Sequence, residues 1–125
     1  MDNLSQVGAH VLAYLGDCVM ELIVRELLVR KGYEKSGKLN EESRKFVTAV
    51  AQSAAYEKIK DMLTEEEALT FRRGKNSSHL NIPKSASNKE YKTATGLEAV
   101  FGYLHLKGDK DRIDELFKAA YADIL

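Results

Sequence analysis

Two features constrain the fold of this chain of 125 residues more than any other. It has a single proline, Pro83, and no segment in which apolar and polar residues alternate. No stretch shows the period of a half-buried strand, whereas apolar residues recur at helical spacing. The polar segment 74–88, "GKNSSHLNIPKSASN", contains the proline and is predicted to be a loop. The sequence therefore predicts an all-α fold, a helical bundle.

Capping signals and periodicity predict five helices in a single domain, residues 1–125. Asn40 is a candidate N-cap, and Thr64 and Glu67 have the spacing of a capping box. Asp109 can cap the last helix. The expected ranges are about 5–31, 40–62, 64–73, 89–107 and 109–124. The first helix carries an apolar stripe formed by Val7, Val11, Leu15, Cys18 and Leu22.

Composition places the chain among ordinary globular proteins, with 44% hydrophobic and 30% charged residues. No apolar run approaches the roughly 20 residues that a membrane span needs. The N-terminus, "MDNLSQVGAH", lacks the pattern of a signal peptide. Cys18 is the single cysteine, which excludes an internal disulfide. We therefore expect a cytoplasmic protein without a membrane partner.

Basic residues are concentrated in one segment, although 19 basic and 19 acidic residues cancel over the whole chain. Residues 72–92 contain six cations and one anion, which gives this segment a charge of +5. Such a segment can be a contact surface for phosphates or simply a solvated loop, and composition leaves both interpretations open.

Two acids lie in apolar helices beside small residues. Asp17 follows Gly16 in "VLAYLGDCVMELIVRELLV", and Glu21 shares its helix face. Asp17 is either a functional carboxylate or a cap after a break at Gly16. Glu98 lies in "YKTATGLEAVFGYLHL" among alanines and glycines that would let a neighbouring helix come close, and its alternative role is a salt bridge.

If the two helices cross at these acids, the carboxylates converge and repel each other unless a cation lies between them. Mg²⁺ or Mn²⁺ takes oxygen ligands and commonly bridges to phosphate oxygens. Together with the basic segment, this pairing suggests metal-dependent hydrolysis of nucleic acid.

Two motifs resemble the ribonuclease III family. "LAYLGDCVMELIVRELL" is similar to its signature L-E-F-L-G-D-S-V-L-E, and "ATGLEAVFGYL" to its second motif A-D-x-L-E-A-x-x-G. The segment "LNEESRKFVTAVAQSAA" resembles the helix between them. "FRRGKN" and the end of the chain at Leu125 narrow the resemblance to the Mini-ribonucleases III, in which the catalytic domain lacks a double-stranded-RNA-binding domain.

The resemblance implies a homodimer with Mg²⁺, or Mn²⁺ as a substitute, at each active site. It places the catalytic and metal-binding acids at Asp17 and Glu98, and gives Glu21 a supporting role. The family's other two acids fall on Ala13 and Thr95, so the number of bound metal ions is open, and Thr95 is expected to hold a metal-bound water. Tyr14 falls at the position of an aromatic dimer anchor, with packing inside one chain as the alternative.

The activity implied is endonucleolytic cleavage of double-stranded RNA that leaves 5′-phosphate and 3′-hydroxyl ends. The expected substrate is the duplex formed by the ends of precursor 23S ribosomal RNA, with a ribosomal protein as a candidate further partner. The residues expected to contact RNA are Arg72, Arg73, Lys75, Asn76, Ser77, Ser78, His79 and Lys84.

Two other classes of function stay open. The chain could be a catalytically silent RNA-binding or ribosome-associated module with the same fold, since two acids are lost. It could also be a helical interaction domain, which would explain the apolar stripes but not the paired acids. Mg²⁺-dependent cleavage of duplex RNA distinguishes the three.

Overall fold

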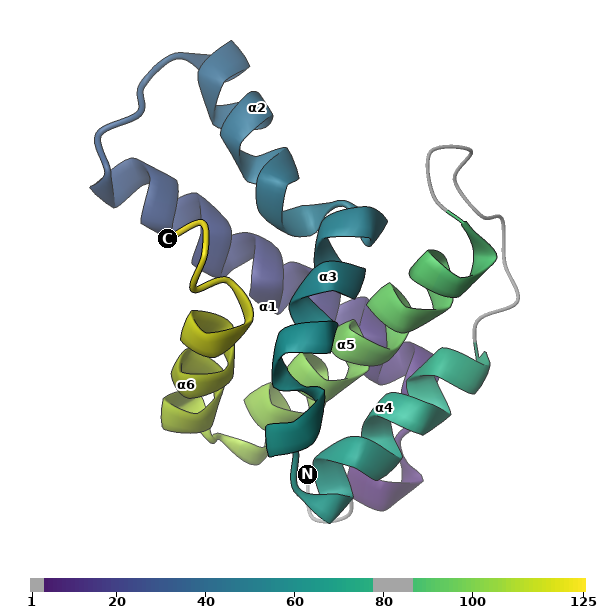
Figure 1. Cartoon of the computed structure of the whole chain (residues 1–125). Helices are drawn as coiled ribbons and strands as arrows, with labels where there is room; N and C mark the ends of the chain where they lie inside the picture. Colours follow the sequence, from purple (N-terminus) through teal and green to yellow (C-terminus); the bar gives the residue numbers. More distant parts are fainter. Residues whose placement is uncertain (1–3, 78–86) are drawn as a thin grey trace.

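The computed structural model describes residues 4–77 and 87–125, which fold into helices packed around one central helix (Figure 1). The α-helices are α1 (Ala9–Arg30), α2 (Ser36–Val47), α3 (Ala49–Ile59), α4 (Glu65–Ser77), α5 (Asn88–Lys107) and α6 (Lys110–Ala120). Two short 3-10 helices are η1 (Leu4–Gln6) and η2 (Lys60–Met62). The described part contains no strand, so the predicted all-α class is confirmed.

Helix α5 is the centre of the bundle, with α1, α3, α4 and α6 packed against it. Figure 1 shows it passing between α3 in front and α1 behind. Its side chains Leu97, Val100 and Phe101 have no exposed surface. A helix that is apolar on most of its faces needs partners on most sides, which explains its central place.

The crossing of α1 and α5 depends on two glycines. A Cβ atom on Gly16 would overlap the backbone carbonyl of Glu98, and one on Gly102 would overlap the carbonyl of Leu12. Glycine is therefore required at both positions for this close approach of the backbones. The small residues that the sequence places beside each acid do let the two helices meet.

One predicted helix, 40–62, is wrong, because the chain turns at Thr48. Helix α2 begins earlier than expected, at Ser36 rather than after Asn40, and ends at Val47. Thr48 has extended backbone angles (φ −70°, ψ 156°), and its hydroxyl accepts a hydrogen bond of 3.1 Å from the amide of Ala51. A threonine hydroxyl that caps the next turn competes with continuation of the helix. The turn sets α3 against α5.

The end of α4 also differs from the expectation. Residues 74–77 were expected in the loop, yet α4 continues through them to Ser77. Gly74 is buried, and a Cβ atom there would press on Ala99 and Gly96 of α5. Packing on α5 thus extends the helix where glycine propensity alone predicts its end.

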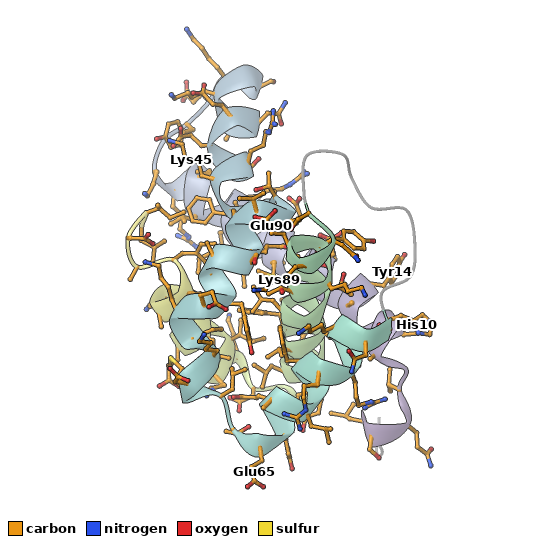
Figure 2. The ribbon with its side chains drawn as sticks, turned by 45° about the vertical axis from the view of Figure 1, so that its right-hand side comes forward. His10, Tyr14, Lys45, Glu65, Lys89 and Glu90 are labelled. Atoms are coloured by element: carbon orange, nitrogen blue, oxygen red, sulfur yellow. The ribbon has the colours of Figure 1, made fainter. Side chains whose placement is uncertain are left out.

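The apolar stripe expected on α1 lies mostly on the outside. The core side of the helix is formed instead by Leu12, Met20, Val24 and Leu28. Leu22 is 65% exposed, and Figure 2 shows His10 and Tyr14 projecting away from the bundle. Helix α1 is therefore apolar on two faces, and α5 covers only one of them.

Capping contacts begin α4 and α6 as predicted. Thr64 and Glu67 form a reciprocal capping box at the start of α4, with hydrogen bonds of 2.9 and 3.1 Å. Asp109 accepts the amide of Arg112 at the start of α6. The Arg112 guanidinium then pairs with the buried Glu67 carboxylate at 2.8 Å, which ties α6 to α4. None of the described helices is long and apolar enough to cross a membrane.

Candidate active site

Asp17 and Glu98 face each other where α1 crosses α5. Asp17 is exposed and Glu98 is half-buried. The charge of Asp17 and a hydrogen bond with Asp17 both act on the Glu98 carboxyl, and the charge of Glu21 reaches it as well. The structure thus brings together the two acids that are 81 residues apart in the sequence.

The setting disfavours ionisation of Glu98. Burial, followed by the charge and hydrogen bond of Asp17, raises the pKa of Glu98 from 4.5 to about 8. Two carboxyl groups this close can share a proton, or both can ionise if a cation lies beside them. Shifts of this size are typical of functional sites.

The donor set fits a hard divalent cation that keeps most of its water. Within residues 4–77 and 87–125, no group of three histidine, cysteine or acidic side chains could hold a metal. Mg²⁺, however, is usually bound through one or two carboxylates together with several waters. Asp17 and Glu98 supply two carboxylates in a setting where a cation would relieve their repulsion.

Gln52 is a buried neighbour of Glu98 that the sequence patterns do not single out. It lies in α3 and is 2% exposed. Its side-chain nitrogen donates to the sulfur of Met20 at 3.8 Å, and a hydrogen bond from Gln52 favours the charged form of Glu98. The available signal was one glutamine within an alanine-rich apolar face, which is too common on helices to stand out.

The supporting residues have contacts of their own. Glu21 pairs with Arg25 at 3.1 Å, in a partly exposed ion pair. The Thr95 hydroxyl donates to the carbonyl of Tyr91 at 3.0 Å, so its oxygen lone pairs, rather than its proton, would face a water. Ala13 is buried in the contact between α1 and α5.

The residues expected to contact RNA differ in how free they are to do so. Arg73 donates to the carbonyl of Val7 at 3.2 Å, and the Ser77 hydroxyl donates to the carbonyl of Gly74 at 2.8 Å, so both are engaged within the chain. Arg72 and Asn76 are exposed on α4, and Lys75 is half-buried. The other three predicted residues, Ser78, His79 and Lys84, lie outside the described residues.

The family profile of the ribonuclease III domain matches residues 10–109, which include both motif helices. The chain therefore belongs to the ribonuclease III family. It is 42% identical over 109 residues to Mini-ribonuclease 3 of Symbiobacterium thermophilum, covering 87% of this chain and 84% of that protein. It is 38% identical over 117 residues to Mini-ribonuclease 3 of Clostridium tetani, covering 93% of this chain and 78% of that protein.

A solved structure has the same fold. The crystal structure of a protein from Fusobacterium nucleatum matches with a TM-score of 0.84 and 34% identity, covering 90% of this chain and 92% of that chain. The expected resemblance to the family and to its Mini-ribonucleases is thus confirmed. Membership of this family supports an endoribonuclease that acts on double-stranded RNA.

Proposed function

We propose that this chain is a cytoplasmic, Mg²⁺-dependent endoribonuclease that cuts double-stranded RNA to 5′-phosphate and 3′-hydroxyl ends, working as one domain over residues 1–125. The observation that carries the proposal is the meeting of Asp17 and Glu98 at the crossing of α1 and α5. The substrate we propose is the paired ends of precursor 23S ribosomal RNA, with a ribosomal protein as a candidate helper.

Asp17 and Glu98 would hold the ion. When bound, a divalent cation supplies activation of water and stabilisation of the leaving oxygen of a phosphodiester. Glu98 must give up its proton before its carboxylate can bind a cation, because burial and the charge of Asp17 raise the pKa of Glu98 and so favour its protonated form while no cation is bound. Asp17 is exposed, which leaves this side of the site open to a phosphate of the RNA backbone.

The exposed face of α1 supports the proposed homodimer. Val11, Tyr14, Leu22 and Val29 are 47%, 84%, 65% and 65% exposed. A row of apolar side chains on one helix marks a surface for a protein partner. Asp17 and Glu21 lie at its border, so two copies docked through this face would place their two sites on one assembly. Duplex RNA lying across both would receive a cut in each strand.

The catalytic proposal predicts that Asp17→Asn removes cleavage while leaving the fold intact. The substitution keeps the size of the side chain but takes away a charged oxygen ligand. Loss of a group that only holds a metal ligand in place already costs about 10- to 100-fold, so loss of the ligand itself should lower the cleavage rate by at least about 100-fold. The measurement is the rate of cleavage of duplex RNA in Mg²⁺, with the product ends identified by their susceptibility to phosphatase.

Asp114→Asn is the matched control, because Asp114 is exposed on α6. This variant should cleave at the wild-type rate. Wild-type cleavage by D17N would contradict the proposal. Wild-type protein that binds duplex RNA but leaves it intact in both Mg²⁺ and Mn²⁺ would favour the silent RNA-binding module instead.

The RNA contacts predict a salt effect. Arg72→Ala should weaken binding of duplex RNA and reduce the slope of log K against log salt by about 1, because one phosphate contact is lost. Lys110→Ala, at an exposed lysine at the start of α6, is the control and should keep the slope. Fluorescence anisotropy of labelled RNA over a series of salt concentrations measures both. An unchanged slope for R72A would mean that Arg72 is a solvated surface residue that makes no phosphate contact.

A further inference from the structure

Gln52 is buried where α1, α3 and α5 meet. Only 2% of it is exposed, although its amide carries two donors and an acceptor. Burying an amide is unfavourable unless its polar atoms are hydrogen-bonded. Its contact with Met20 is made to a thioether sulfur at 3.8 Å, and such a sulfur is only a weak acceptor. The contact with Met20 therefore does not account for the burial of Gln52.

The second contact of Gln52 is with Glu98. The side-chain nitrogen has two hydrogens and two acceptors as neighbours, the Met20 sulfur and the Glu98 carboxyl. The two contacts together orient the amide with its nitrogen toward the site. Gln52 is also a neutral donor, so it can bind a carboxylate without competing with a cation for charge.

The backbone around Gln52 is fixed by the turn at Thr48. Gln52 lies in the first turn of α3, where its backbone N–H donates to the backbone carbonyl of Thr48 at 2.9 Å. On the other side of the turn, the buried hydroxyl of Tyr121 donates to the carbonyl of Phe46 at 2.7 Å. This pair of bonds holds the end of α2 and the start of α3, and so determines where the amide of Gln52 lies.

We propose that Gln52 is a positioning residue that holds the Glu98 carboxylate in the orientation in which it binds the divalent cation. The inference rests on the proposed function. Carboxylates that bind a metal are commonly held by hydrogen bonds from neighbouring groups, and loss of such a group lowers metal affinity about 10- to 100-fold. Gln52 fills this place from a third helix, which neither acid belongs to.

The competing account is that Gln52 only fills the core between α1 and α3. In that case its contact with Met20 would matter as much as its contact with Glu98. Met20→Leu removes the sulfur acceptor and keeps most of the volume, whereas Gln52→Leu removes both contacts. The two variants therefore separate a role in packing from a role in holding Glu98.

The test is the affinity of the RNA-free protein for Mn²⁺, measured by titration calorimetry at pH 7.5. Q52L should bind Mn²⁺ at least about 10-fold more weakly than the wild type. M20L should bind within about 2-fold of it. The Mn²⁺ concentration for half-maximal cleavage should rise in Q52L by a similar factor, while its affinity for duplex RNA in EDTA stays unchanged.

Wild-type Mn²⁺ affinity in Q52L, or an equal loss in M20L, would overturn the inference and leave the proposed function standing. Failure of the proposed function shows separately, as wild-type cleavage by D17N. If Q52L lacks the helical circular dichroism of the wild type, Gln52→Asn decides by the same criteria, since its amide is one methylene shorter and falls short of Glu98.

Discussion

The surroundings of Glu98 favour the neutral form of its carboxyl group over the charged form. Burial raises the pKa of Glu98 most, Asp17 raises it further, and a hydrogen bond from the neutral Gln52 side chain lowers it. A purely structural acid would be expected to have a cation as its partner, as Glu67 has Arg112 at 2.8 Å. Glu98 has instead another acid, and this contrast is what makes it a candidate ligand.

The metal-free protein should therefore lose stability as the pH rises. Because the folded pKa of Glu98, about 8, is above its ordinary value of 4.5, the folded state holds the proton more tightly than the unfolded state between these values. Below about pH 4.5 Glu98 is neutral in both states and does not lower the free energy of unfolding. Between about pH 4.5 and pH 8 its ionisation in the unfolded state lowers the free energy of unfolding by at most about 1.4 kcal/mol per pH unit. Glu98→Gln, which stays neutral, should be more stable than the wild type at pH 8.

Urea unfolding in EDTA at a series of pH values measures this difference. Glu41→Gln, at an exposed glutamate of α2, is the control and should keep the wild-type pH dependence. Saturating Mn²⁺ should restore stability to the wild type at pH 8 but not to E98Q, since a ligand that binds only the folded state stabilises it. Parallel pH profiles for E98Q and wild type would contradict the assigned pKa shift.

At the residue scale, the sequence supports a prediction of the two acids but not of Gln52. Asp17 and Glu98 can be found because a charge in an apolar helix beside glycine is unusual. A glutamine among alanines is ordinary, and its burial depends on the turn at Thr48. Arg73 is a similar case, because only the folded chain brings it to the carbonyl of Val7.

At the scale of elements, the predicted helices depend on local signals, and those signals differ in strength. Thr64 and Asp109 start helices as predicted because each bonds a backbone amide three residues on. Thr48 does the same for Ala51, but it follows an apolar run that continues without a break in the sequence. Because Thr48 lies inside a periodic apolar pattern, the sequence does not indicate a turn there. The packing of α3 on α5 favours the turn.

Alanine should have opposite effects at a glycine in the crossing of α1 and α5 and at a glycine outside it. Gly16→Ala places a methyl group against the carbonyl of Glu98, and overpacking of this kind should destabilise the protein by about 1–3 kcal/mol or more. Gly37→Ala, at an exposed position of α2 with no atom within 4 Å of the added Cβ, should instead stabilise by up to about 1 kcal/mol. The free energy of unfolding in urea measures both.

The two glycine variants also separate stability from activity. Because Gly16 adjoins the site, G16A should lose Mn²⁺ affinity in the fraction that stays folded, as the helices move apart between Asp17 and Glu98. G37A should bind Mn²⁺ as the wild type does. Equal stability of G16A and wild type would contradict the close crossing of α1 and α5 at Gly16.

At the scale of the whole molecule, α1 joins the core, the site and an uncovered apolar surface. One face of α1 packs on α5, and Asp17 lies between that face and the exposed row of Val11, Tyr14 and Leu22. The sequence indicates the apolar residues of this row but not the side on which they lie, since both faces of α1 are apolar. Their exposure follows from α5 having room for one face only.

A charge on this surface should separate the proposed dimer. Leu22→Glu places a carboxylate at a position that is 65% exposed in one chain, so the monomer should fold normally. In a dimer docked through this face, the carboxylate would be buried without a partner, which costs several kcal/mol. Sedimentation at micromolar concentration should give twice the chain mass for wild type and the chain mass for L22E.

Leu69→Glu is the matched control, because Leu69 is a 51% exposed leucine that belongs to α4 rather than to α1. L69E should remain a dimer and cut both strands of a duplex at paired positions. L22E, with its two sites separated, should keep its circular dichroism and its Mn²⁺ binding but produce single-strand nicks at a reduced rate. A wild-type protein that sediments as a monomer, or an L22E variant that stays dimeric, would contradict the proposed dimer through this face. The proposal of paired cuts, which depends on that dimer, would then fail as well.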